Sequence, residues 1–149
     1  MDRIYLDHAA SSPLTARAAQ AMGIAMAQSG NPGSPHAEGR AAKDVLEGAR
    51  SRVATAWGAR PREVLFTASG TVACQLALLG AARARKASSD HVVISGIEHP
   101  AITEAVPMLE AEDFRISRVA PNPDGRVDAD AFLDAIGDGA AVAALMVAN

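Results

Sequence analysis

The hydrophobic positions along the chain fall into two kinds of segment, short apolar runs and longer Ala-rich stretches mixed with charge. The short runs are rich in β-branched residues, which is typical of buried strands, and they lie at 64–67, 91–95, 114–119 and 141–147. The longer stretches predict helices, at 15–28, 37–57, 71–86, 100–111 and 128–136. Strands that alternate with helices are typical of parallel β-α-β units. We therefore predict an α/β fold with a largely parallel sheet and flanking helices.

Turn-forming residues mark the boundaries of these segments. Residues 29–36, Ser-Gly-Asn-Pro-Gly-Ser-Pro-His, form the densest cluster and predict a loop between the first two helices. Gly58 and Pro61 are expected to end the second helix, and Pro100 is well placed at the first turn of a later one. The chain shows no repeat and no low-complexity tract.

Composition changes this picture little. Of the 149 residues, 49% are apolar and 21% charged, as in an ordinary globular protein with a core of its own. The net charge of −3 argues against nucleic acid or an anionic membrane as a partner. A single cysteine fits a reducing compartment. The sequence shows neither a signal peptide nor a run of roughly 18 apolar residues, so we expect a cytoplasmic protein.

The turn at residues 68–71, Ala-Ser-Gly-Thr, lies between an expected strand and an expected helix. In open parallel sheets, ligands bind beyond the carboxyl ends of the strands. Free backbone N–H groups at a helix start attract anions, and Gly70 would let a phosphate approach closely. A plain tight turn with Thr71 as the N-cap explains the same residues equally well. The sequence lacks the lysine of a P-loop and the third glycine of a dinucleotide fingerprint.

His99 follows the apolar run 91–95 and precedes Pro100, so it also lies at the carboxyl end of an expected strand. A histidine in that position can stack on a ring or move protons near neutral pH. The alternative interpretation is a histidine that only caps the next helix or faces solvent. The histidines, acidic residues and cysteine show no metal-ligand spacing, so we expect no metal site.

Five motifs in sequence order resemble those of the cysteine desulfurases, members of the class-V aminotransferase group of pyridoxal 5'-phosphate (PLP) enzymes. They are YLDHAASSP at 5–13, GNPGSPHAEGR at 30–40, FTASGT at 66–71, EHPA at 98–101 and PNPDGRVD at 121–128. Met146 and Asn149 fall where this family begins an Asn-containing run. The resemblance extends over the whole chain and implies the N-terminal part of the large domain of a PLP-dependent transferase.

The resemblance also assigns roles to individual residues. It implies that Gly70 and Thr71 bind the PLP phosphate. It places His99 over the pyridine ring, both as a cofactor-binding residue and as the catalytic residue that assists proton transfer. Asn149 falls in the family's pair of asparagines, of which either Asn149 or the next residue would contact the ring oxygen. Where the family has a glutamate after the threonine, this chain has Val72.

The resemblance covers roughly the first two fifths of a family member. It implies an N-terminal segment at 1–14 and an incomplete PLP-binding large domain at 15–149, with the family's Schiff-base lysine and nucleophilic cysteine falling beyond this stretch. Neither lysine of the chain, Lys43 or Lys86, is expected to replace the first, and Cys74 in a helix is not expected to replace the second. We therefore expect residues 1–149 alone to be inactive.

For the complete protein, the resemblance implies conversion of L-cysteine to L-alanine, with the sulfur passing to an enzyme cysteine as a persulfide. The sulfur would supply iron–sulfur cluster assembly or another sulfur-donor pathway through an acceptor protein, and the enzyme would be a homodimer. Two alternatives remain open. One is a non-catalytic binding or assembly module that works with a partner chain, and the other is a different class-V activity, such as selenocysteine lyase or aminotransferase.

Overall fold

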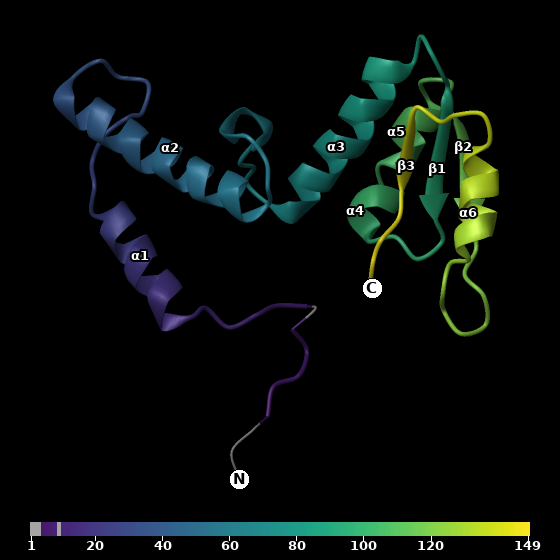
Figure 1. Ribbon diagram of the computed structural model, residues 1–149, viewed down its shortest axis with the longest axis horizontal. Helices are drawn as coiled ribbons and strands as arrows, with labels where there is room; N and C mark the ends of the chain where they lie inside the picture. Colours follow the sequence, from purple (N-terminus) through teal and green to yellow (C-terminus); the bar gives the residue numbers. More distant parts are fainter. Residues whose placement is uncertain (1–3, 9) are drawn as a thin grey trace. The chain divides into compact units, whose positions relative to one another are not determined.

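The computed structural model describes residues 4–8 and 10–149, and the chain divides into two compact units, Met1–Leu65 and Phe66–Asn149 (Figure 1). Residues 1–3 and 9, which belong to the expected N-terminal segment 1–14, lie outside the described residues. The expected division into 1–14 and 15–149 therefore stays a prediction.

The first unit contains α1 (Ala16–Met26), α2 (Ala37–Ala56) and the short 3₁₀ helix η1 (Pro61–Glu63). Both long helices begin with a side-chain cap, since Thr15 accepts from the Ala18 N–H and His36 accepts from the Gly39 N–H. Such caps satisfy N–H groups that have no partner within the helix. The two helices predicted for this part of the chain are confirmed.

The loop before α2 folds closely onto the start of that helix. Asn31 accepts a hydrogen bond from the Gly33 N–H at 2.9 Å through its side chain, and from the Ser34 N–H at 2.9 Å through its carbonyl. A Cβ atom on Gly39 would lie 2.3 Å from the Ser34 carbonyl oxygen. Because that oxygen belongs to the backbone, only glycine lets the helix pass this close to the loop.

The second unit is built on a three-stranded sheet with order β2-β1-β3. The central strand β1 (His91–Ser95) pairs in parallel with β2 (Arg115–Val119) on one side and with β3 (Val142–Ala144) on the other. The register joins Val92 to Val142 at one edge of the sheet. The predicted parallel sheet is thus confirmed, with β3 shorter than expected.

Residues 64–67, predicted as a strand, do not form one. Val64 has extended backbone angles (φ −102°, ψ 120°), but its carbonyl accepts a hydrogen bond from Arg50 Nη1 at 2.6 Å. Its N–H bonds back to the Pro61 carbonyl. A strand requires ladder bonds to a neighbour, and here a side chain and a turn take those bonds instead. The apolar run thus predicted the extended backbone of Val64 correctly and sheet membership wrongly.

The helix predicted over 100–111 is divided into α4 (Pro100–Thr103) and α5 (Val106–Glu110). Pro107 lies in the first turn of α5, a position that tolerates proline. In one continuous helix its ring would clash with the carbonyl of Thr103, and its missing N–H would leave that carbonyl unpaired. The proline therefore separates the two short helices.

The helices cover both faces of the sheet. Helix α3 (Gly70–Arg85) packs against α4 and β3, and α6 (Ala129–Ile136) packs against β1 and β2 (Figure 1). Side chains of a strand alternate between faces. Buried side chains from α3, β1, α4 and α5, together with Ala105, Phe114 and Ala141, form one cluster. Its members are Leu78, Ala82, Val92, Ile94, Ile102, Ala105, Val106, Leu109, Phe114 and Ala141.

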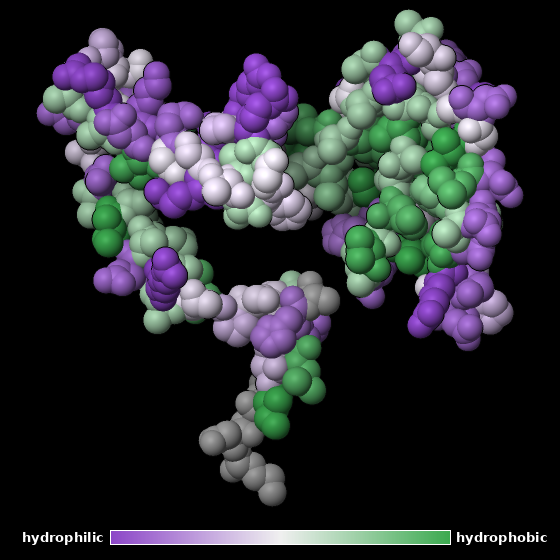
Figure 2. Space-filling view, viewed as in Figure 1, coloured by the Kyte–Doolittle hydropathy of each residue, from purple (hydrophilic) through white to green (hydrophobic). Residues whose placement is uncertain are grey.

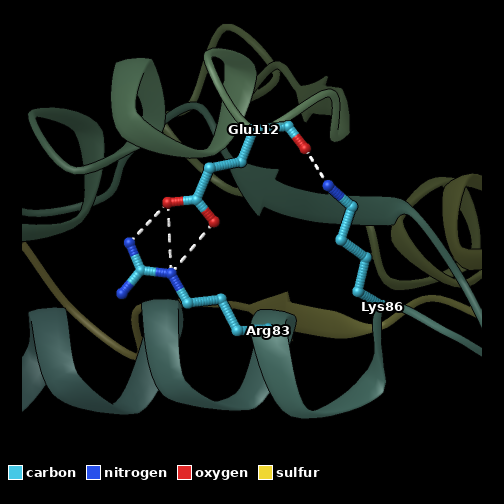
Figure 3. A network of polar contacts seen from close by, with 3 residues as sticks. All are labelled: Arg83, Lys86 and Glu112. Carbon is cyan, nitrogen blue, oxygen red and sulfur yellow. Dashed lines mark hydrogen bonds and ion pairs between the residues drawn. The ribbon is translucent and has the colours of Figure 1, made fainter.

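A polar network fastens the last turn of α3 to the turn that follows α5 (Figure 3). Arg83 donates from Nε and Nη2 to the carboxylate of Glu112 at 2.5–3.2 Å. Lys86 donates to the carbonyl of Glu112, and its ammonium lies 4.9 Å from the centre of the Phe114 ring. The hydrogen bond from Arg83 lowers the pKa of Glu112. Both the charge and the carbonyl of Glu112 thus hold α3 in place.

Candidate functional site

The N-terminal end of α3 is capped by Ser69, whose Oγ accepts from the Val72 N–H at 3.2 Å. Thr67 Oγ1 donates to the Ser69 carbonyl at 2.8 Å, and this bond holds the cap residue in place. The interpretation of Thr71 as the N-cap is therefore wrong: Ser69 is the cap, because its extended backbone turns its hydroxyl back onto the first turn. Gly70 and Thr71 lie exposed within that turn.

The first turn of α3 has the donor chemistry that a phosphate requires. It offers the N–H groups of Gly70 and Thr71 and the Thr71 hydroxyl at the positive end of a 16-residue helix. A Cβ atom on Gly70 would meet nothing within 4 Å, so the space in front of the backbone is open. These residues fit a bound phosphate group.

His99 is the N-cap of α4, and its Nδ1 accepts from the Ala101 N–H at 3.0 Å. The capping interpretation of this histidine is therefore confirmed as a local role. An imidazole that accepts at Nδ1 carries its proton, when neutral, at Nε2. Because the side chain is exposed, Nε2 remains the atom through which His99 could meet a ligand.

Glu98, next to His99, joins the ends of two strands. Its Oε1 accepts from Ser95 Oγ and from the Met146 N–H, both at 2.6 Å. Ser95 is the last residue of β1 and is fully buried, and Met146 follows β3. Sequence reasoning assigned no role to Glu98. Its place beside His99 in the EHPA motif was the only signal.

Asn149 lies close to the same loop. Its Nδ2 donates to the Ile97 carbonyl at 2.9 Å. Ile97 is two residues before His99, so Asn149 lies beside the loop that carries the histidine. The structure thus brings Asn149 to the loop that carries His99, although 50 positions separate the two residues in the chain.

A surface cavity of about 830 Å³ opens at the carboxyl ends of β1 and β3. Its walls come from the loop after β1 (96–97), the turn at 125–127 and the segment 145–149. This is the edge where ligands bind in parallel sheets. Apolar side chains gather on the visible face of this unit, around β3 and α6 (Figure 2). Leu145 and Val147, which line the cavity, are exposed. Of the four predicted site residues, the cavity is lined by Asn149 and not by Gly70, Thr71 or His99.

The remaining predicted groups have defined places in the second unit. Packing between α3 and α4 ties the helix that carries Gly70 to the helix that His99 caps. Lys86 lies at the other end of α3, about 24 Å along a 16-residue helix, and its ammonium is bound to Glu112. Cys74 is half-buried and packs against the core cluster. The expectation that neither residue serves as a catalytic group stays a prediction.

Comparisons with known proteins identify the relatives of this chain. Residues 4–149 match the family model described as aminotransferase class-V. An IscS-like cysteine desulfurase of Mycobacterium tuberculosis (strain ATCC 25618 / H37Rv) is 38% identical over 151 residues, which cover 97% of this chain and 38% of that protein. The predicted resemblance to cysteine desulfurases is confirmed. The chain spans about 40% of the length of the curated relatives it matches.

Solved structures agree with the fold. A structure titled "SspA in complex with cysteine" superposes with a TM-score of 0.81 at 28% identity, covering 91% of this chain and 40% of that one. DndA from Streptomyces lividans superposes with a TM-score of 0.72 at 34% identity, covering 88% and 37%. Among the described residues, the structure contains no helix long and apolar enough to span a membrane.

Proposed function

Since the chain belongs to the class-V aminotransferase family, we propose that it contributes part of the PLP site of a cysteine desulfurase. The observation that carries the proposal is the open first turn of α3, where Gly70 and Thr71 offer donors beyond the Ser69 cap. That turn belongs to the same unit as His99 and Asn149. The relatives, which are cysteine desulfurases, support this general function.

The proposed task of the α3 first turn is to bind the phosphate of the cofactor. The N–H groups of Gly70 and Thr71 would donate to its oxygens, and the Thr71 hydroxyl would add a third hydrogen bond. The helix dipole favours the negative charge at this end. The open space at Gly70 supports this role, because a phosphate can approach the backbone without meeting a side chain.

His99 is proposed to stack on the cofactor ring and to hold or move a proton at Nε2. Its Nδ1 is engaged by the Ala101 N–H, which fixes the orientation of the imidazole. Asn149 is proposed to donate to the ring oxygen. One hydrogen of its amide nitrogen is bound to the Ile97 carbonyl, and the second hydrogen of that nitrogen is the donor for the ring.

PLP, when bound, supplies an electron sink that stabilises negative charge at the substrate carbon. The proposed overall reaction of the complete enzyme converts L-cysteine to L-alanine and leaves the sulfur as a persulfide on an enzyme cysteine. The relative whose structure is titled as a complex with cysteine supports this substrate. We propose further that the complete enzyme is a cytoplasmic homodimer, and that an acceptor protein takes the sulfur for iron–sulfur clusters or another sulfur-donor pathway.

Residues 1–149 by themselves are proposed not to turn over cysteine. The ammonium of Lys86 is held by the Glu112 carbonyl at the far end of α3 from Gly70 and Thr71. A lysine held there cannot reach a cofactor whose phosphate lies at the start of the helix. The measurement is sulfide and alanine production by the purified 149-residue protein with added PLP, corrected for the reaction of free PLP with cysteine. Turnover lost in Lys86→Ala or Cys74→Ala would contradict this proposal.

The phosphate site is tested by titrating the 149-residue protein with inorganic phosphate and with PLP, followed by amide NMR shifts. We expect the largest shifts at Gly70 and Thr71. Thr71→Ala removes a hydrogen bond to a charged group and should weaken binding roughly 10- to 100-fold. Thr55→Ala, in α2 of the first unit, is the matched control and should leave the affinity unchanged. Shifts that cluster elsewhere, or an unchanged affinity in Thr71→Ala, would refute the assignment.

A further inference from the structure

The backbone ladder between β1 and β3 ends before the two strands reach the candidate site. Its last register pair is Ile94 with Ala144. On the other side of β1, pairing with β2 continues to Ser95 with Val119, and Gly96 N then donates to the Val119 carbonyl at 2.7 Å. The segment 145–149 therefore leaves β1 without further ladder bonds just where it approaches the loop 96–99.

Two hydrogen bonds of a different kind hold the segment beyond this point. The Met146 N–H donates to Glu98 Oε1 at 2.6 Å, and Asn149 Nδ2 donates to the Ile97 carbonyl at 2.9 Å. The bonded partners lie 48 and 52 positions apart in the chain. The loop after β1 thus supplies one side-chain acceptor and one backbone acceptor to the segment after β3.

The chemistry of Glu98 suits this task. A single oxygen, Oε1, accepts from two donors, Ser95 Oγ and the Met146 N–H. A carboxylate oxygen has the lone pairs for two donors, and charge-assisted bonds are shorter and stronger than neutral ones. The bond to Ser95 anchors the carboxylate to the fully buried end of β1. Within the described part of the chain, every buried side-chain N or O atom has a hydrogen-bond partner, so the Ser95 hydroxyl relies on Glu98.

We propose that Glu98 is a positioning residue that locks the segment 145–149 onto the loop 96–99 and thereby holds Asn149 against the loop that leads into His99. The effect of this lock on cofactor binding is the part of the inference that rests on the proposed function. The Glu98 carboxylate accepts its hydrogen bonds from Ser95 and the Met146 backbone, and not from Gly70 or Thr71. It acts through the Met146 backbone, three residues before Asn149, and through the loop that leads directly into His99.

Three variants of the 149-residue protein separate the lock from a general effect on stability. Glu98→Gln keeps an oxygen acceptor at the same distance and should retain the lock. Glu98→Leu keeps much of the volume but removes the acceptor, and Glu98→Asp keeps the charge but is one methylene shorter. Glu110→Leu, at an exposed position in α5, controls for the loss of one carboxylate. The amides of β1 report in every variant whether the second unit is folded.

The primary measurement is hydrogen exchange and the NMR shift of the Met146 backbone amide, together with the side-chain amide signals of Asn149, without any cofactor. In Glu98→Leu and Glu98→Asp, Met146 exchange should accelerate roughly tenfold or more, as for a lost bond to a charged group. The Asn149 side-chain signals should shift toward solvent-exposed values. Glu110→Leu should remain near wild type, and Glu98→Gln should lie closer to wild type than to Glu98→Leu, because its amide oxygen still accepts both bonds but without the charge. Unchanged Met146 exchange in a folded Glu98→Leu or Glu98→Asp protein would overturn the proposal.

A PLP titration of the same variants then tests the consequence for the site. Affinity should fall in Glu98→Leu and Glu98→Asp and be restored in Glu98→Gln. If Met146 and Asn149 respond as expected but the affinity is unchanged, Glu98 does not position the cofactor-binding residues, and that part of the inference is wrong. If the wild-type protein does not bind PLP, the proposed function fails, whereas the Met146 and Asn149 signals still decide whether Glu98 locks the two segments.

Discussion

Replacing Leu78 by alanine should destabilise the second unit far more than the same replacement at Leu76, two residues earlier in α3. Leu78 is 2% exposed and belongs to the core cluster, whereas Leu76 is 52% exposed. The substitution is chemically identical and lies in the same helix. Any difference between the two variants therefore reports the burial of the side chain and not helix propensity.

The magnitude follows from the carbons removed. Leucine to alanine deletes three carbon groups, which at about 0.8 kcal/mol each gives a transfer cost of roughly 2.4 kcal/mol for a buried side chain. The cavity left behind adds about 24 cal/mol per Å³, so the full cost at Leu78 should be about 3 to 4 kcal/mol. At Leu76 about half of the side chain is already in water, which limits the cost to roughly 1.2 kcal/mol. We expect a difference of about 2 to 3 kcal/mol.

The assay must report on the second unit alone. The single tryptophan, Trp57, lies in the first unit and is 84% exposed, so its fluorescence is a poor probe. Hydrogen exchange of the Val93 and Ile94 amides, in the central strand, measures the free energy of opening the sheet itself. Equal losses of protection at these amides in the Leu76→Ala and Leu78→Ala proteins would refute the assignment of Leu78 to the core and of Leu76 to the surface.

Two further predictions use the same chain. Gly39→Ala should destabilise the start of α2, because a Cβ there would lie 2.3 Å from the Ser34 carbonyl oxygen. Gly48→Ala should instead stabilise α2 by about 0.5–1 kcal/mol, because its Cβ meets only the Arg52 side chain, at 3.4 Å. Amide exchange within α2 measures both, and a stabilising Gly39→Ala would contradict the structure. Because Arg83 lowers the pKa of Glu112 in the folded chain, the stabilisation is fully present above the unfolded pKa, about 4.3, and is lost as pH falls through the lower folded pKa. The stability difference between wild type and Glu112→Gln should therefore vanish in acid, and a difference that persists there would refute the charge-based account.

Local sequence signals predicted the elements that are determined by residues adjacent in the sequence. The apolar run at 91–95 became the central strand, and Pro100 began a helix as expected. The run at 64–67 is also apolar but forms no strand. The side chain of Arg50 donates to the Val64 carbonyl, which a ladder would need. No local pattern could show that competition, since the two partners lie 14 residues apart and meet only after folding.

The same limit applies to the candidate site. Gly70, Thr71 and His99 are predicted as site residues from their places at segment boundaries and from the family resemblance. The bond from the Met146 N–H to Glu98 joins residues 48 positions apart, and its donor is a backbone group that carries no sequence signal. The capping of α3 by Ser69 was missed because Ser69 and Thr71 are both good N-cap residues. Only the backbone geometry, extended at Ser69, distinguishes them.

The strand order β2-β1-β3 also has a consequence for synthesis of the chain on the ribosome. Val92, Val93 and Ile94 are fully buried in the finished sheet, but both neighbours of their strand are made later. The register partner of Val92 in β3 is Val142, 50 residues downstream, which takes about 3 to 10 seconds to translate at roughly 5–20 residues per second. During that interval the most apolar strand emerges with at least one edge unpaired. This segment is therefore exposed to chaperones and to self-association during that interval.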